Sequence, residues 1–353
     1  MEKVKLSDIC NPKQWKTIPT GDLLDEGYPV YGANGIIGYY SKYNHENPVI
    51  AVTCRGATCG SINITVPNAY VTGNAMCLDD VRNDVDINYL YYCLKHYDFN
   101  NVISGSAQPQ ITRQGMDKIF ISICCHDEQC EIVDRLKKIE NVINFRKQEI
   151  ELLDKLIKAR FVEMFGDPYV NPLKWEKLKI KDAVTIEPQN GLYKPQSDYV
   201  TDGSGIPILR IDGFYDGMVT DFASLKRLKC SETERQRYLL LEDDIVINRV
   251  NSIEYLGKCA HIKDLLEDTV YESNMMRMHF DPEYYNPVYI CKLLCSQFIY
   301  DQIVNHAKKS VNQASINQKD VLDFNIYQPP LDLQNEFANF VHQVDKSKFM
   351  KSF

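Results

Sequence analysis

The sequence has no long hydrophobic run. Of its 353 residues 44% are hydrophobic, but the uncharged apolar stretches are far shorter than the roughly 20 residues with which a helix spans a bilayer. The N-terminal stretch MEKVKLSDIC carries charges with no apolar segment behind them, which argues against a secretory signal peptide. We therefore expect a cytoplasmic protein that does not span a membrane.

No C-x-x-C pair occurs among the 12 cysteines. Structural zinc sites are commonly built from such closely spaced pairs, and disulfide frameworks belong to small secreted domains. Most of these cysteines instead lie in apolar stretches such as YYCLKH and YICKLLC, where a free thiol behaves as a small buried hydrophobic group. We expect reduced core cysteines and no metal site.

The familiar catalytic motifs are also missing. The sequence contains no G-x-x-x-x-G-K-[ST], no H-E-x-x-H and no Glu followed two positions later by Lys, the arrangement of many metal-dependent nucleases. The segment NPVY at Asn286–Tyr289 is only a distant echo of the NPPY-type motif of amino-methyltransferases. The net charge of −8 argues against a uniformly positive surface, although local basic clusters can still bind nucleic acid. Together these observations favour a binding protein over an enzyme.

What the sequence does contain is one long stretch with coiled-coil spacing, residues 127–166. Its apolar residues are spaced by four and three in alternation, with Arg146 and Arg160 filling the two gaps. These residues are Ile132, Leu136, Ile139, Ile143, Ile150, Leu153, Ile157 and Met164. No Pro or Gly interrupts the pattern, which predicts a helix of about 58 Å at about 1.5 Å per residue. We expect a spacer between two globular domains; an ordinary long helix of a helical domain is the alternative.

Residues 1–126 and 167–330 repeat one pattern of short strands, turns and an amphipathic helix. Residues that recur 200 positions later include Asn74, Met76, Tyr89 and Leu94. Those that recur 205 positions later include Gln108, Ile111, Gln129 and Glu131. So nearly constant an offset indicates a duplicated domain plus helix. We therefore predict an α+β chain in four parts: a first domain at 1–126, a long helix at 127–166, a second domain at 167–330 and a shorter helix at 331–353.

Two polar loops occupy matching places in the two halves, SGSAQPQITRQ at Ser104–Gln114 and KKSVNQASINQ at Lys308–Gln318. Gln and Asn can pair bidentately with adenine, and Arg or Lys with guanine, whereas Ser, Thr and Lys suit phosphate contacts. We predict that these loops bind DNA; the alternative is that they are simply hydrophilic. The candidate residues are Ser106, Gln108, Gln110, Arg113, Lys308, Lys309, Asn312 and Gln313.

With these features in place, the chain resembles the specificity subunits of type I restriction–modification enzymes over essentially its full length. The resemblance is carried by the tandem halves and by the segments YPVYGANGIIGYY, RGATCGSI, IPILRI, DIVINRVNS and QPPLDLQNEF. It implies two target-recognition domains, each reading one part of a split double-stranded DNA site, and long helices that pair as an antiparallel coiled coil and dock modification subunits. It adds four candidate DNA-binding residues: Arg55, Arg210, Arg249 and Asn251.

The resemblance also implies that the chemistry lies outside this chain. No catalytic residue or cofactor is expected here, with S-adenosylmethionine and ATP held by partner subunits: DNA methyltransferase (modification) subunits, two of them, and restriction or translocase subunits. Two rival classes remain open. One is a methyltransferase or nuclease with an unrecognised active site, and the other is a coiled-coil adaptor that binds only protein.

The second half of the long helix carries an apolar seam without a counterpart. In the 205 register Phe353 falls on Gln148, so residues 149–166 have no matching partner in the C-terminal helix. Exposed apolar stripes generally mark a contact surface, so we predict that a modification subunit or a second copy covers this seam. The alternative is that the seam folds back on its own recognition domain. The seam residues are Ile150, Leu153, Ile157 and Met164.

Overall fold

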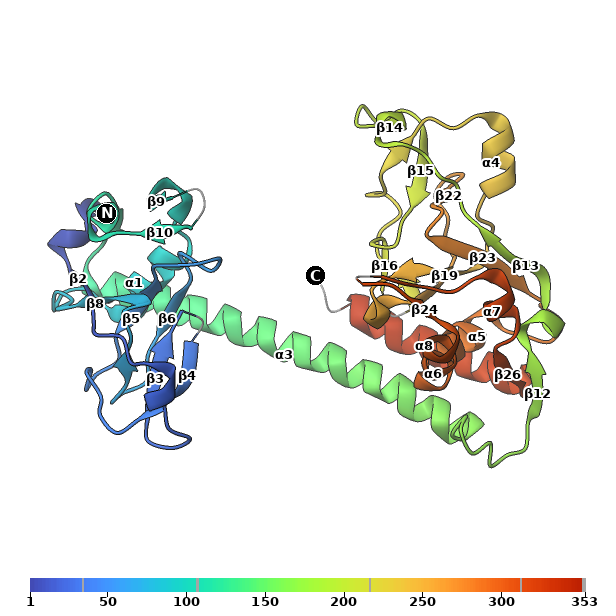
Figure 1. Ribbon diagram of the computed structural model, residues 1–353, viewed down its shortest axis with the longest axis horizontal. Helices are drawn as coiled ribbons and strands as arrows, with labels where there is room; N and C mark the ends of the chain where they lie inside the picture. Colours follow the sequence, from blue (N-terminus) through green and yellow to red (C-terminus); the bar gives the residue numbers. More distant parts are fainter. Residues whose placement is uncertain (34, 106–107, 216, 312, 351–353) are drawn as a thin grey trace. The chain divides into compact units, whose positions relative to one another are not determined.

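The computed structural model describes residues 1–33, 35–105, 108–215, 217–311 and 313–350. The chain forms two compact units, residues 1–147 and 148–353. Both units combine strands with helices (Figure 1), which confirms the predicted α+β class. Helix α3 (His126–Phe165) contributes its first part to one unit and its last part to the other. Among the helices in the described ranges, none is both long and apolar enough to cross a membrane.

The first unit is built on a four-stranded antiparallel sheet with the order β2–β8–β5–β6. Its strands are β2 (Asn11–Gln14), β8 (Ala75–Asp79), β5 (Ile50–Thr53) and β6 (Ile62–Ile64). The smaller sheets are β1 (Glu2–Lys5) with β11 (Phe120–Ile123), β3 (Tyr28–Gly32) with β4 (Gly35–Tyr40) and β7 (Tyr70–Val71), and β9 (Ile103–Ser104) with β10 (Gln110–Ile111). Its short helices are α1 (Ile87–Lys95) and α2 (Arg113–Met116).

Helix α1 shows how the sequence sets these elements. It begins after Asp86, whose carboxylate accepts hydrogen bonds from the N–H groups of Asn88 (2.8 Å) and Tyr89 (2.9 Å) and so caps the helix. Leu90 and Leu94, four residues apart on one face, are fully buried in the core beneath the sheet strands β5 and β8.

The second unit contains a six-stranded sheet and a four-stranded sheet. The first consists of β13 (Val184–Asn190), β23 (Met275–Phe280), β19 (Ile245–Asn248), β21 (Cys259–His261), β17 (Gly217–Val219) and β16 (Phe214–Tyr215), in that order. The second consists of β14 (Tyr199–Val200), β18 (Arg227–Leu228), β15 (Ile206–Leu209) and β22 (Val270–Tyr271).

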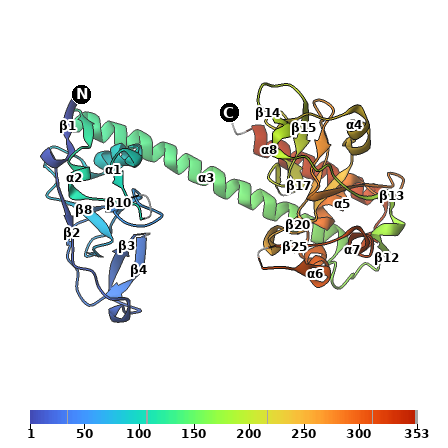
Figure 2. The same ribbon diagram turned by 45° about the horizontal axis from the view of Figure 1, so that its top comes forward.

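Shorter elements complete the second unit. Strand β12 (Glu176–Lys179) pairs with β26 (Asn325–Gln328), and β25 (Ala314–Ser315) pairs with both β20 (Val250–Asn251) and β24 (Lys308–Lys309). The helices are α4 (Glu232–Tyr238), α5 (Pro287–Leu294), α6 (Gln297–His306), α7 (Gln318–Leu322) and α8 (Leu331–Met350). Helices α6 and α7 and strands β20 and β25 lie together at one end of the unit (Figure 2).

The two units share one hydrogen-bond framework. Strand β8 pairs with β5 in the same register in which β23 pairs with β19. At the end of each pair the backbone bond is also the same: the N–H of Cys54 donates to the carbonyl of Asn74 (3.1 Å), and the N–H of Arg249 donates to that of Asn274 (2.8 Å). The repeated sequence pattern therefore corresponds to a repeated fold.

Helix α8 packs antiparallel against the last part of α3 within the second unit (Figure 1). Two ion pairs show this orientation. Arg160, near the end of α3, pairs with Glu336, near the start of α8 (3.1 Å), whereas Asp154, earlier in α3, pairs with Lys348, near the end of α8 (2.6 Å). Between them the Phe161 ring contacts the Phe337 ring, with 5.5 Å between their centroids. An antiparallel helix pair is thus present in this unit, whereas a coiled coil that separates two domains remains a prediction.

The apolar seam of α3 is largely covered by its own chain. Ile157 and Met164 are only 3% and 8% exposed and lie in one core with α5 and α8, and Leu153 packs partly buried against that core. Ile150 is 42% exposed. The prediction that another protein covers this seam is therefore wrong for Ile157 and Met164, because the second domain supplies enough apolar surface to bury them.

Candidate nucleic-acid interface

The first predicted loop forms a hairpin between β9 and β10. Ser104 pairs with Gln110 across this hairpin, and Gln110 also forms a bridge with Arg55 on its other side. The N–H of Gly56 donates to the carbonyl of Pro109 (3.1 Å), which holds the two segments together. Because Arg55, Gln108 and Gln110 are all exposed, the fold brings three predicted DNA-binding side chains onto one edge.

Arg113 begins helix α2 immediately after this hairpin. The preceding Thr112 caps the helix by accepting a hydrogen bond from the N–H of Gly115 (3.1 Å). The Arg113 guanidinium donates to Oδ1 of Asn11 on β2 (3.0 Å) and stays exposed. Arg113 therefore lies near the hairpin but is held by an uncharged partner, which leaves its charge available.

The second predicted loop forms the equivalent hairpin between β24 and β25. Ala314 pairs with Lys309 on one side and with Asn251 on the other, so the lysine and the asparagine flank the same strand. The carbonyl of Gln313 accepts from the N–H (2.7 Å) and hydroxyl (2.9 Å) of Ser310, which fixes the turn while the Gln313 side chain remains exposed. Lys308 and Lys309 are exposed beside this turn.

Two predicted arginines make contacts within the second unit. Arg249 is half-buried and donates to the carbonyl of Ser273 (3.1 Å). Arg210 donates to the hydroxyl of Tyr199 (3.2 Å) and lies 4.0 Å from the carboxylate of Glu272, which is buried. Both guanidinium groups thus have partners within the chain, and DNA contact by either residue stays a prediction.

Glu272 explains why Arg210 is held there. Burial raises the pKa of its carboxyl group, while the N–H of Ile211, which donates to Oε1 (2.7 Å), and the charge of Arg210 act in the opposite direction. Removing Arg210 from this place would leave a poorly compensated buried carboxylate.

Two predicted residues cannot be placed, and one exposed lysine near the second hairpin was not predicted. Ser106 and Asn312 lie outside the described residues. Lys319 was not predicted, although it is exposed in the first turn of α7, which is capped by Asn317 as α2 is capped by Thr112. The 205-residue offset between these two caps was the signal that could have drawn attention to it.

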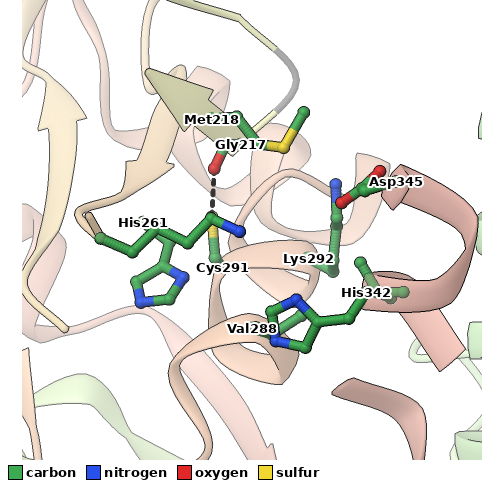
Figure 3. Close-up of a pocket in the computed structure, with 10 residues that line it drawn as sticks. Gly217, Met218, His261, Val288, Cys291, Lys292, His342 and Asp345 are labelled. Carbon is green, nitrogen blue, oxygen red and sulfur yellow. Dashed lines mark hydrogen bonds between the residues drawn. The ribbon is translucent and has the colours of Figure 1, made fainter. Parts of the chain in front are cut away.

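A pocket in the second unit offers little room for a substrate. It measures about 20 Å³ and lies between strands β17 and β21 and helices α5 and α8, with His261, Lys292 and His342 around it (Figure 3). The Cys291 thiol donates to the carbonyl of Gly217 (3.5 Å), and a neighbouring thiol together with burial raises the pKa of Cys291. A space of this size holds about one water molecule, so this pocket is not a candidate for binding a nucleotide or a methyl donor.

Comparison with known proteins gives a consistent result. The family model described as "Type I restriction modification DNA specificity domain" matches residues 1–155 and 172–351. The chain is 26% identical over 258 residues to the type I restriction enzyme EcoKI specificity subunit of Escherichia coli (strain K12), covering 69% of this chain and 54% of that protein. It is 21% identical over 375 residues to the MjaVIII specificity subunit of Methanocaldococcus jannaschii, covering 95% of this chain and 87% of that one.

A solved structure has the same fold. The crystal structure of a type I restriction–modification system S subunit from M. genitalium matches with a TM-score of 0.60 and 15% identity, covering 98% of this chain and 90% of that chain. The chain spans about half the length of the EcoKI relative and most of the length of the other two proteins.

Proposed function

Since this chain belongs to the type I restriction–modification DNA specificity family, with a match to the family's domain in each half, we propose that it is the subunit that recognises DNA in such a system. In this proposal each half reads one part of a bipartite double-stranded target. The chain itself carries no catalytic residue. S-adenosylmethionine and ATP are held by partner subunits.

The observation that carries the proposal is the pair of equivalent hairpins. Each half extends one hairpin, β9–β10 or β24–β25, and each hairpin carries an exposed glutamine at the same place in the repeat, Gln108 and Gln313. Glutamine can bind an adenine edge through two hydrogen bonds, and the neighbouring Lys308, Lys309 and Arg55 can bind phosphates or guanine. A protein-only adaptor has no need of two such matched polar edges.

The partners proposed for this subunit are DNA methyltransferase subunits, two per chain, and restriction or translocase subunits. Two modification subunits suit a chain with two equivalent halves, because each half can present the same surface to one copy. We infer that this chain works in the cytoplasm, where such a complex would meet its DNA.

DNA binding by the full chain provides the test. We expect fluorescence anisotropy with a random duplex to show a binding constant whose logarithm falls steeply and linearly with the logarithm of salt concentration. With labelled S-adenosylmethionine, the chain alone should transfer no methyl group to DNA, and the chain together with a modification subunit should transfer it. Absence of DNA binding at low salt would favour the adaptor, and methyl transfer by the isolated chain would favour the enzyme.

A further inference from the structure

Three side chains with metal-binding atoms meet in the first unit, away from the hairpin. Cys77 and Asp79 lie two residues apart on strand β8, so both side chains point to the same face of the sheet. His45 lies in the loop after β4 and pairs with Ala69 through a β-bridge. The imidazole nitrogen, the thiol sulfur and a carboxylate oxygen all lie within 4.8 Å of one another.

The hydrogen bonds around His45 show which group each of its ring nitrogens faces. Nδ1 of His45 lies 2.7 Å from Oδ1 of Asn44. That oxygen is identified by its neighbours, since it accepts from the N–H of Val71 (2.8 Å) while the Asn44 amide nitrogen donates to the Val71 carbonyl (3.0 Å). Nδ1 must therefore carry a proton. The other ring nitrogen, Nε2, then faces a carboxylate oxygen of Asp79 at 3.0 Å, a contact that needs a proton or a cation between the two atoms.

Little water can reach the cluster. The side chains of His45 and Asp79 are 10% and 12% exposed, and Cys77 is fully buried. The second carboxylate oxygen of Asp79 accepts from the indole N–H of Trp15 (3.1 Å), which fixes its direction. Burial and the nearby Asp79 charge raise the pKa of Cys77.

In the second unit, the position that matches Cys77 holds an arginine, so the chain itself supplies the positive charge. Cys77 and Asp79 correspond, 200 residues later, to Arg277 and His279 on β23. The Arg277 guanidinium binds Oδ2 of the fully buried Asp244 (2.9 Å), and Nδ1 of His279 lies 3.1 Å from Oδ1 of the same carboxylate. The second unit thus places a permanent positive charge where the first unit has a thiol.

We propose that His45, Cys77 and Asp79 form a zinc-binding site in the first domain. Zn²⁺ takes nitrogen, sulfur and oxygen ligands in tetrahedral geometry at about 2.0–2.3 Å, which places ligand atoms roughly 3.3–3.6 Å apart. The cluster needs a contraction of roughly 1 Å to reach this geometry. The hydrogen bond from Nδ1 to Asn44 and the bond from Trp15 to Asp79 orient two of the ligands, as the surroundings of metal sites commonly do.

Binding exchanges protons for the metal. The Cys77 sulfur forms a bond to Zn²⁺ and its S–H bond breaks, so that proton leaves to the buffer. A proton held between Nε2 of His45 and the Asp79 carboxylate leaves in the same way, and a water molecule completes the four ligands. Zinc affinity should therefore increase as pH rises. The bound ion fastens the His45 loop to β8.

The test uses the reduced, metal-free full chain titrated with Co²⁺ and then with Zn²⁺. We expect one Co²⁺ per chain, with a near-ultraviolet thiolate-to-cobalt band and tetrahedral visible bands that Zn²⁺ bleaches. Zn²⁺ should also raise the melting temperature of the chain. The variants Cys77→Ala and His45→Ala should lose the band, whereas the control Cys93→Ala, which removes a half-buried thiol in α1 of the same unit, should keep it.

A measurement on the unaltered chain keeps the test decisive if a variant fails to fold. X-ray absorption at the zinc edge should give one sulfur and three nitrogen or oxygen ligands. Two or more sulfur ligands would assign the ion to other cysteines and overturn the proposal. Absence of a thiolate band in the unaltered chain would also overturn it and would leave the contact between His45 and Asp79 as a hydrogen bond.

Discussion

The side-chain amide of Gln334 makes the same three hydrogen bonds that Gln129 makes 205 residues earlier. Oε1 accepts from the N–H of Asp86 (2.8 Å) in one case and of Asn286 (2.9 Å) in the other. Nε2 of Gln129 donates to the carbonyls of Asp84 and Cys124, and Nε2 of Gln334 to those of Tyr284 and Pro329. Each amide therefore ties the first turn of a long helix, α3 or α8, to the start of a short one.

This relationship predicts the effect of removing one amide. Gln334 is fully buried, so Gln334→Ala leaves a donor and two carbonyl groups without partners. Each such group costs about 1–3 kcal/mol, and we expect about 2–4 kcal/mol for the variant because water can enter part of the space. Urea denaturation of the full chain measures the change. The control Gln236→Ala removes an exposed amide that donates to Glu232 on α4 and should cost less than about 0.5 kcal/mol; equal destabilisation by the two variants would contradict the role assigned to Gln334.

The repeated fold could be predicted because duplication leaves a trace that needs no structural information. A constant offset pairs residues such as Gln129 and Gln334 directly, and their local surroundings then repeat as well. The two hairpins were found in the same way. Their flanking strands were harder to predict, because the bridge between Arg55 and Gln110 joins segments that are distant in the sequence.

The direction of a side chain and the identity of its partner could not be predicted. Arg210 stands in a family-like segment, but its acidic neighbour Glu272 is brought to it by the pairing of β15 with β22. The spacing of Ile157 and Met164 is the same whether a second protein or the same chain covers them. His45 is separated from Cys77 and Asp79 by three strands, so a search for closely spaced ligands does not find the cluster.

The proposed function predicts that the two halves read DNA independently. We expect that exchanging residues 178–330 for the matching domain of a relative changes one half of the methylated target and leaves the other half intact. Methylome sequencing of cells that carry the complete system measures this directly. As a control, returning the original segment should restore the original target. A change in both half-sites together would contradict independent reading.

The β24–β25 hairpin predicts two different effects on DNA binding. Lys308→Ala and Lys309→Ala should each weaken binding to all sequences and reduce the salt slope by about one unit for each phosphate that the variant no longer neutralises. Gln313→Ala should instead cost about 1–3 kcal/mol on the cognate site and little on random DNA. Anisotropy titrations on both duplexes separate the two outcomes. Lys229→Ala, an exposed lysine near Asp202 in the same unit, serves as control; equal weakening of both duplexes by Gln313→Ala would refute base contact.

Burial of His261 predicts that the second unit becomes less stable in acid. Burial lowers the pKa of His261, although the carboxylate of Asp243, 2.8 Å from Nε2, acts in the opposite direction. Below its ordinary pKa of about 6.5, the unfolded chain takes up a proton at this histidine that the folded chain resists. The stabilising contribution is therefore present above about pH 6.5 and disappears as pH falls from there.

Denaturation midpoints at neutral and mildly acidic pH measure this effect. His261→Gln should reduce the difference between the two midpoints, whereas His342→Gln, at an exposed position of α8, should leave it unchanged. If both variants respond to pH as the unaltered chain does, His261 does not account for the acid sensitivity.

The packing of α3 against α8 predicts that the buried residues of the α3 seam contribute to the stability of the fold. Ile157 lies in the core that α3 shares with α5 and α8, so Ile157→Ala should destabilise the chain by about 2–4 kcal/mol. Ile150 belongs to the same heptad pattern but is largely exposed, so Ile150→Ala should cost less than about 1 kcal/mol. Urea denaturation compares the two variants.

Light scattering on Ile150→Glu, alone and mixed with a modification subunit, then shows whether the exposed end of the seam binds a partner. Failure to assemble with unchanged stability assigns Ile150 to an interface, and unchanged assembly restricts the seam to a folding role.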